Sequence, residues 1–555
     1  MSLRRPPATW IALAAYALLA VAIFSNTWAD LAGRWIGSPK DPQLFIWYLG
    51  WIPHQLGLGE NPLFTDYLSY PHGANLMWNT SMIFPAVLLW PVTTAFGPVV
   101  AYNLLITAGI ALSAWCGFLA ARLFVHGDLM CFVAGLMYGF SPALMAQALG
   151  HPHAVVALFP PLAVMLGHEI LVRRRFNPAG VGALAGVAAA LQLLTGEELL
   201  AETLVIAACG VALLALLHRD QVRASLPYVA KATIAALAVF AVLAAFPLGF
   251  QFFGPQRVSG NVQAPDVYVS DLLAFFLPSS LIHFTGNVTE NDAYVGLPLL
   301  ALFAAGLVMG WRVPRIRWIG LTALVVVVLS LGPHLHVNGN VTPIVLPWAA
   351  VALLPLLGSA LPARLMEIGF LPIGIVVAYA GARALNATQN WRIATGLVLI
   401  AGLAVTAPPL PYPSVRAVAP AFFKQGGDVA RIPEGSVVLI TPFSSKESTD
   451  AMYWQAVAGY RFRMPEGDAF TPGPYLGPHP SFLQSTLDQL ETGQPIVVTP
   501  GVRDAARADL KSFSVSTIVA GPSPGQRAIV KFLTEVVGAP PADDGGVKVW
   551  WKLTP

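Results

Sequence analysis

The sequence predicts a polytopic α-helical membrane protein that ends in an α/β domain. Hydrophobic residues make up 56% of its 555 positions and charged residues only 11%, with a mean hydropathy of +0.65. Such a composition excludes disordered and ordinary soluble proteins. About eleven apolar stretches have roughly the 20 residues needed to cross a bilayer. After about residue 410, short apolar runs alternate with helical patterns, which is typical of a small α/β domain.

The apolar stretches begin close to the first residue. The first one follows a basic start and precedes no small-residue cleavage site, so we expect a retained helix instead of a signal peptide. A shorter stretch at 81–97 contains two prolines, and we expect an interfacial helix there instead of a span. The expected spans cover about 9–29, 99–123, 129–149, 153–172, 178–195, 199–217, 226–248, 293–311, 317–332, 365–385 and 391–408.

The distribution of arginine predicts the orientation of these spans. With the N-terminus inside, every basic turn falls on the cytoplasmic side, as the positive-inside rule requires. Counting 81–97 as a span would move Arg173, Arg174 and Arg175 outside and break this pattern. The polar clusters fall on the opposite side, so we expect the chemistry to be extracytoplasmic, at the cytoplasmic (inner) membrane. The expected parts are a transmembrane domain at 1–410 with outer loops 30–98 and 249–292, and an extracytoplasmic domain at 411–555.

The C-terminal part reads as short buried strands with helices between them. A helix is expected at 480–493, where the apolar spacing is helical. The net charge of +3 is small and no long basic run exists, so we expect no nucleic-acid partner. The expected strands are 436–440, 495–500, 515–521 and 547–553.

An acidic residue opens the first outer loop. Asp41 precedes Pro42, which is an ordinary helix start with Asp at the N-cap and Pro at the first helical position. The following helix would lie in the membrane interface, with Trp47, Tyr48 and Trp51 at headgroup depth. The alternative makes Asp41 a general base at the membrane surface. The two roles are compatible, because a capping carboxylate is ionised and fixed in position.

Three glutamates occupy the apolar stretch "LQLLTGEELLAETLVIA" at 191–207. Glu197 and Glu198 lie at the expected helix start, where the dipole favours their charge, so they could simply cap the helix. They could also bind substrate or a basic partner at the outer mouth. Glu202 shares a helix face with Glu198 and lies deeper, so we expect it to be neutral or paired with a His or Arg of a neighbouring span.

Histidine pairs occur on the same expected side of the membrane. They are His151 with His153 and His334 with His336, each pair separated by one residue. Four outward-facing histidines could ligate a metal or bind phosphate, although ordinary loop histidines have the same spacing.

Two arginines also lie in outer segments. Arg364 opens a span on the outer side, against the positive-inside trend, and Arg257 lies in the second large outer loop. A cation beside apolar surface needs a partner, and a lipid phosphate suits a guanidinium. The sequence contains no P-loop, no dinucleotide-binding glycine motif after a strand and no serine nucleophile elbow.

Several segments together resemble a known superfamily. They are "DPQLFIWYLGWIPHQL", "LQLLTGEELL", "PDVYVSDLLAFFLPS", "ENDAYVGLPLL" and "SLGPHLHVNG" followed by "LPWAAVALLPLLGSALPARLM". Over about residues 9–410 the chain is similar to the GT-C membrane glycosyltransferases, which use polyprenyl-phosphate-linked sugars. More narrowly, it resembles a family of actinobacterial proteins of this class.

This resemblance implies a mechanism and a set of site residues. A carboxylate of the first outer loop would deprotonate the acceptor hydroxyl, and Asp41 matches its position. The paired-acid form of the family motif is absent because Pro42 follows, which leaves Asp66 as a rival base. The donor phosphate would be held by cations, so no metal and no cofactor beyond the lipid-linked sugar is expected. The implied phosphate-binding residues are Arg364, Arg257, His151 and His153, and the implied substrate cavity holds Glu197, Glu198, Glu290, Tyr294, His334 and His336.

The expected function is sugar transfer from a polyprenyl-phosphate donor to a cell-envelope glycan or lipid outside the cytoplasmic membrane. Membrane lipids and the acceptor are the expected partners. A non-catalytic protein that binds a glycolipid or scaffolds an envelope assembly is one alternative. A lipid or glycan transporter is another, although transporters tend to carry repeats and polar residues at the membrane centre, and the polar clusters here gather at one mouth.

Overall fold

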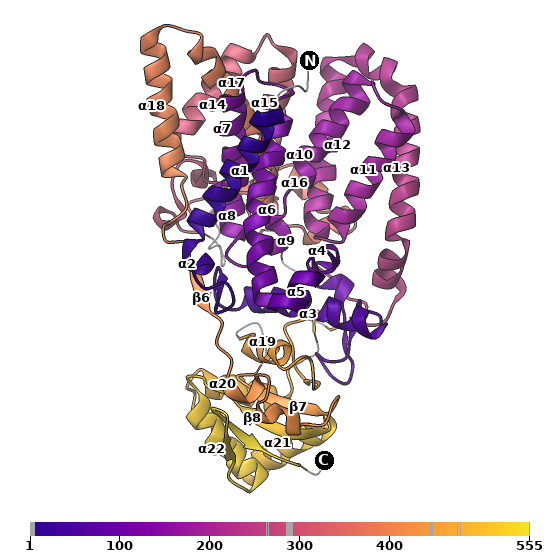
Figure 1. Cartoon of the computed structure of the whole chain (residues 1–555), viewed down its shortest axis with the longest axis vertical. Helices are drawn as coiled ribbons and strands as arrows, with labels where there is room; N and C mark the ends of the chain where they lie inside the picture. Colours follow the sequence, from indigo (N-terminus) through magenta and orange to yellow (C-terminus); the bar gives the residue numbers. More distant parts are fainter. Residues whose placement is uncertain are drawn as a thin grey trace. The chain divides into compact units, whose positions relative to one another are not determined.

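The computed structural model describes residues 6–261, 264, 266–284, 292–443, 448–473, 476–477 and 479–553 (Figure 1). Within them the chain groups into two compact units, each built from three stretches of sequence. The second unit combines the expected C-terminal domain with most of the expected first outer loop. The first unit comprises the chain up to Ala29, Asn103–Ala245 and Asn261–Pro413, and the second Asp30–Tyr102, Phe246–Gly260 and the chain from Ser414.

The expected multi-pass helical architecture is confirmed. In the described part of the chain, six helical stretches are long and apolar enough to cross a membrane. The other expected spans are helical too but shorter, so eleven crossings stay a prediction. The helices of the six long stretches and of the other expected spans are α1 (Pro6–Ile23), α6 (Pro98–Ala121), α7 (Asp128–Gly139), α8 (Pro142–Gln147), α9 (Pro152–Val155), α10 (Phe159–His168), α11 (Pro178–Leu193), α12 (Glu197–Leu217), α13 (Arg219–Phe253), α14 (Leu297–Gly310), α15 (Pro314–Ser330), α17 (Leu365–Leu385) and α18 (Gln389–Val405).

Helix α17 forms the core of the first unit. Almost every residue from Leu365 to Gly381 is buried, and α7, α14 and α15 pack against it. Glycine makes this close packing possible, since a Cβ at Gly306 of α14 would lie 2.5 Å from the carbonyl oxygen of Val376. In contrast, the apolar side chains of α13 are mostly exposed, which suits contact with lipid. Shorter elements of this unit are α2 (Ser25–Trp28), β4 (His334–Val337), β5 (Asn340–Val345) and α16 (Trp348–Val351).

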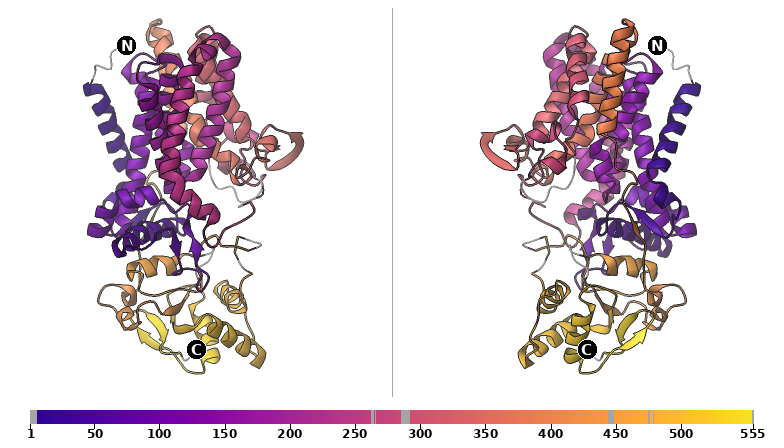
Figure 2. Two further views of the ribbon diagram at one scale, coloured as in Figure 1. Left: turned by 90° about the vertical axis from the view of Figure 1, so that its right-hand side faces the viewer. Right: turned by 90° about the vertical axis from the view of Figure 1, so that its left-hand side faces the viewer.

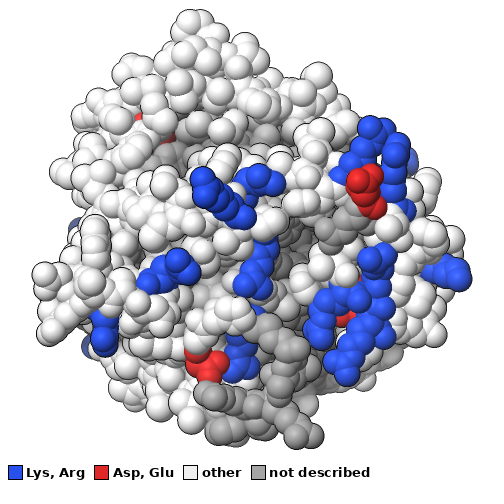
Figure 3. Space-filling model, turned by 90° about the horizontal axis from the view of Figure 1, so that it is seen from above, with Lys and Arg blue, Asp and Glu red and all other residues white. Residues whose placement is uncertain are grey.

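The end of the helices seen in Figure 3 is basic. Lys and Arg side chains gather there and few acidic ones lie among them. This distribution matches the arginine-rich turns that the sequence assigns to the cytoplasmic side.

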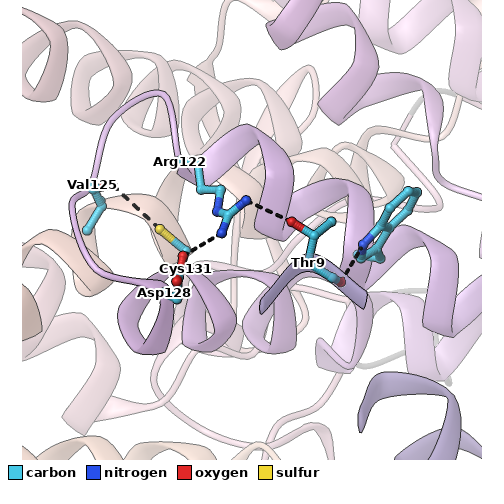
Figure 4. Close-up of polar contacts among 6 residues, drawn as sticks. Thr9, Arg122, Val125, Asp128 and Cys131 are labelled. Carbon is cyan, nitrogen blue, oxygen red and sulfur yellow. Dashed lines mark hydrogen bonds and ion pairs between the residues drawn. The ribbon is translucent and has the colours of Figure 1, made fainter. Parts of the chain in front are cut away.

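One of these turns is fixed by a polar network (Figure 4). Arg122, which follows α6, donates hydrogen bonds to Thr9 Oγ1 of α1 at 2.9 Å and to Asp128 Oδ1 of α7 at 2.6 Å. Trp115 Nε1 donates to the carbonyl oxygen of Thr9 at 3.1 Å. A single guanidinium therefore ties three helices together at their ends.

The C-terminal part of the second unit contains a four-stranded mixed sheet in the order β7-β8-β10-β9. β7 pairs with β8 in parallel, and the other pairs are antiparallel. The helices α20, α21 and α22 supply apolar side chains to the same core. The bounds are β7 (Val437–Thr441), α20 (Phe482–Glu491), α21 (Pro500–Ser512), β8 (Val515–Ala520), α22 (Gln526–Val537), β9 (Ala542–Asp544) and β10 (Val547–Trp550).

Three of the four expected strands and the expected helix are confirmed, but the strand at 495–500 is wrong. That segment pairs with no strand of the described chain, and Pro500 begins α21. Pro495 and Pro500 have no N–H to donate to a ladder. Ile496 and Val498 still pack against the sheet core, which explains their apolar character. Strand β9, whose sequence is polar and was not expected, occupies the sheet edge instead.

The expected first outer loop, at 30–98, folds as protein core and not as a membrane-surface helix. Trp47, Tyr48 and Trp51 of α3 (Asp41–Leu58) are fully buried, so their expected place at headgroup depth is wrong. Trp47 Nε1 donates to Gln455 Oε1 of α19 (Asp450–Val457) at 2.7 Å, and Tyr460 Oη donates to the Trp47 carbonyl at 2.8 Å. The stretch 81–97 forms two short helices and no span, as expected. The remaining elements here are β1 (Arg34–Ile36), β2 (Phe64–Thr65), β3 (Ala74–Asn75), α4 (Ile83–Leu88), α5 (Trp90–Phe96) and β6 (Ser414–Arg416).

Candidate substrate site

A partly buried ion pair links the start of α12 to the segment before α17 in the first unit. Glu198 Oε2 lies 2.6 Å from Arg364 Nη1. The other carboxylate oxygen accepts a hydrogen bond from the backbone N–H of Leu361 at 2.8 Å. Arg364 ends the 3₁₀ turn Pro362–Arg364, which runs directly into α17. Glu198 therefore reaches across to another segment, and α12 shows no side-chain cap of its own.

The turn before α12 is shaped by tight packing. Gly196 precedes the helix, and a Cβ at this position would lie 3.2 Å from the Cβ of His153. The buried side chain of Gln192 donates a hydrogen bond to the Gly196 carbonyl at 3.0 Å. The sequence "TGEE" thus combines a glycine that permits close approach with the carboxylates that follow it. Glu197, the first residue of α12, is half-buried.

Further carboxylates surround the ion pair. Glu202 lies one turn deeper, is 1% exposed, and accepts no hydrogen bond from the described residues. It interacts electrostatically with Glu198, Arg364 and Asp292. Asp292 is buried as well, and its Oδ1 accepts a hydrogen bond from Gln147 Nε2 at 3.3 Å. Glu198 and Glu202 therefore share one guanidinium, and Asp292 adds a further negative charge near Glu202, which is costly for folding and typical of a functional site.

The two histidine pairs have different surroundings. His151 and His153 lie with their rings nearly perpendicular, their centroids 5.9 Å apart, and His153 interacts electrostatically with Arg364. His334 and His336 instead face Asp266, with His334 Nδ1 2.9 Å from Asp266 Oδ2 and His336 Nε2 3.9 Å from Oδ1. Burial lowers the pKa of His336 and favours its neutral form. Within the described ranges, no group of three His, Cys, Asp or Glu side chains is arranged to hold a metal ion.

The two candidate bases belong to the second unit. Asp41 is the first residue of α3 and does not cap it, because Lys40 occupies the N-cap position with φ 80°. The expected N-cap role is therefore wrong by one residue. The Lys40 carbonyl accepts from the Thr449 hydroxyl at 2.8 Å, which fixes the chain before the helix. Asp66 Oδ2 forms an ion pair with Arg463 at 3.2 Å, so a cation already engages this carboxylate.

The remaining expected residues are dispersed. Arg257 belongs to the second unit, is exposed, and donates to the Phe252 carbonyl at 3.3 Å. Tyr294 is buried in the first unit beside Gly296. Glu290 lies outside the described residues. The structure adds Asp292 to the candidate site, and its position two residues after Glu290 in the quoted "ENDAYVG" segment was the only sequence signal for it.

Comparisons with known proteins identify the fold. No family model and no curated protein matches the sequence. The arabinofuranosyltransferase AftD from Mycobacteria matches with a TM-score of 0.56 at 15% identity, covering 92% of this chain and 36% of AftD. The oligosaccharyltransferase AglB from Archaeoglobus fulgidus, solved with an inhibitory peptide and a dolichol-phosphate, matches with a TM-score of 0.51 at 12% identity, covering 92% of this chain and 69% of AglB.

The chain therefore spans about a third of the length of AftD and about two thirds of that of AglB. Its fold is that of these membrane glycosyltransferases, which confirms the GT-C-like fold expected from the sequence.

Proposed function

We propose that this protein is a membrane glycosyltransferase that takes its sugar from a polyprenyl-phosphate donor. The observation that carries the proposal is the pair of donors around the Glu198 carboxylate, the Arg364 guanidinium and the Leu361 N–H. They occur in a chain with the fold of AftD and AglB, and AglB was solved with a dolichol-phosphate.

The carboxylate of Glu198 has the charge and the oxygen spacing to stand in for two phosphate oxygens. A guanidinium and a backbone N–H at the start of a helix are a common anion-binding combination. The donor phosphate would displace Glu198 and take over its two hydrogen bonds. His153 lies within electrostatic range of Arg364 and would face the same phosphate. Charge that develops on the leaving phosphate is then stabilised by groups already in place.

Asp41 is the proposed general base for the acceptor hydroxyl. It is partly exposed and has the position of the carboxylate that the resemblance to GT-C enzymes implies, whereas Asp66 is engaged by Arg463. Asp41→Asn should lower the transfer rate by about 10²–10⁴-fold, the usual contribution of general base catalysis, with the melting temperature unchanged. Asp66→Asn is the matched control. Full activity in Asp41→Asn together with an inactive Asp66→Asn that melts normally would assign the base to Asp66.

Donor binding by Arg364 can be tested on protein reconstituted in liposomes with synthetic polyprenyl-phosphate sugars. Arg364→Ala should weaken donor binding at least tenfold, and Arg364→Lys should restore only part, because the planar fork is lost. Glu198→Gln should strengthen donor binding, since the amide no longer competes as an anion. Arg392→Ala, which removes an exposed arginine in the first turn of α18, is the control and should bind donor normally.

The outcomes separate the candidate functions. Unchanged donor affinity in Arg364→Ala would reject the phosphate site. Donor binding without sugar transfer to any acceptor would favour the scaffold alternative. Movement of the intact lipid between leaflets would favour the transporter.

We also propose that the arginine-rich turns lie in the cytoplasm and that the C-terminal sheet lies outside the cytoplasmic membrane. The basic end of the helices supports this orientation. Protease added to the outside of unlysed spheroplasts should then remove the C-terminal sheet.

A further inference from the structure

The segment between β4 and α17 exposes apolar side chains and carries no charge. Residues 337–363 contain no Asp, Glu, Lys, Arg or His. Strand β5 is exposed at five of its six positions, so the described part of the chain covers neither of its faces. The exposed large apolar side chains of this segment are Val341, Ile344, Val345, Leu353, Leu354 and Leu356.

The β4–β5 hairpin is held in place at its tip. The N–H of Gly339 donates to Asp271 Oδ2 at 2.9 Å, and the N–H of His283 donates to Asn338 Oδ1 at 3.2 Å. A Cβ at Gly339 would lie 2.1 Å from the His283 carbonyl oxygen, so the turn packs directly on that loop. Because the tip is anchored, the exposure of β5 is a property of a fixed element and not of a free chain end. Figure 2 shows this hairpin standing out from the side of the helices.

The segment and the strand β4 before it connect two apolar helices. The first is α15, which ends at Ser330, and the second is α17, which starts at Leu365. Arg315 lies in the first turn of α15, so the segment is at the opposite end of this helix from the basic turn. Val328, in the last turn of α15, is exposed and extends the apolar surface toward the hairpin.

We propose that segment 337–363 is an interfacial membrane anchor whose exposed side chains enter the leaflet opposite the basic turns. Exposed apolar surface of this extent is unfavourable in water, and the segment has no charged side chains to form the rim of a protein interface. A two-stranded sheet has unpaired backbone edges, which hydrocarbon does not tolerate. The segment therefore lies at the boundary of headgroups and acyl chains and does not cross the bilayer. This inference is independent of glycosyltransferase activity.

Spin labels on full-length protein in nanodiscs of phosphatidylethanolamine and phosphatidylglycerol test the anchor. Labels are attached to Ile344→Cys and Leu353→Cys, with Val497→Cys as the control because Val497 is 79% exposed on a loop beside the C-terminal sheet. The ratio of accessibility to oxygen over accessibility to a water-soluble nickel chelate should be severalfold higher at both segment positions than at Val497. The background replaces the three natural cysteines by alanine, at Cys116, Cys131 and Cys209.

Three results would overturn the proposal. A ratio at positions 344 and 353 as low as at Val497 would place the segment in water. Dipolar broadening between labels of two protein copies in one disc would identify a second copy as the occupant. Hydroxyl-radical footprinting of the unmodified protein provides a second measurement that needs no substitution. It should leave peptides from 337–363 unmodified in nanodiscs, and modification equal to that of the Val497 peptide would also exclude lipid contact.

Discussion

Replacing Arg364 by alanine should destabilise the first unit by about 2–4 kcal/mol. Removing one partner of a buried pair costs about 3–5 kcal/mol, because the other charge stays buried without compensation. The side chains of Arg364 and Glu198 are 11% and 23% exposed, so water screens the remaining charge in part and the lower end applies. The loss is larger than for an isolated pair, since Glu202 also interacts with the same guanidinium.

The substitution of the other partner should be much milder. In Glu198→Gln the amide oxygen still accepts from the Leu361 N–H, and Arg364 keeps the Glu202 carboxylate within electrostatic range. A cost of about 1 kcal/mol is expected, near that of one hydrogen bond. The free energy of unfolding is measured by denaturant titration in mixed micelles, with Arg257→Ala as the surface control. Equal losses in Arg364→Ala and Glu198→Gln would refute the idea that one cation serves several carboxylates.

Two further predictions concern the second unit. Gly50→Ala should lower stability by about 1–3 kcal/mol, because the new Cβ would lie 2.2 Å from Tyr460 Oη. Gly57→Ala in the same helix should instead stabilise the protein by about 0.5–1 kcal/mol, because the nearest neighbour of its Cβ lies 3.8 Å away. Thermal unfolding compares the two variants. Burial raises the pKa of Glu466 well above the usual carboxyl range. As the pH rises, the unfolded chain ionises at this position before the folded chain does, so stability falls between about pH 4 and the folded-state pKa. Glu466→Gln should therefore match the parent protein near pH 4 and exceed its stability at pH 7.5, and equal melting temperatures at both pH values would contradict this.

The sequence predicts where helices and strands lie better than it predicts what their side chains pack against. The apolar run from about 199 predicts a span, the acidic residues before it predict that the helix starts at Glu197 and Glu198, and α12 does begin at Glu197. The row Trp47, Tyr48 and Trp51 was expected at the membrane surface and is buried against α19 instead. Aromatic helices that face lipid headgroups and those that face a protein core have the same composition, so periodicity alone could not decide between them. The strand expected at 495–500 failed for a similar reason, since Ile496 and Val498 reach the core from a loop.

The candidate site shows where local reasoning from the sequence ends. The spacing of Glu198 and Glu202 correctly put both on one helix face, but their shared cation is Arg364, 166 residues away from Glu198. Nothing local to either segment encodes that pairing. If Arg364 lies on the expected outer side, the pairing explains how an arginine can open a span there against the positive-inside rule, because carboxylates inside the protein match its charge. The pairing of Arg364 with these carboxylates also affects the proposed donor binding. A phosphate that enters must compete with Glu198 for Arg364, so a binding gain in Glu198→Gln and a stability loss in Arg364→Ala are two consequences of one arrangement.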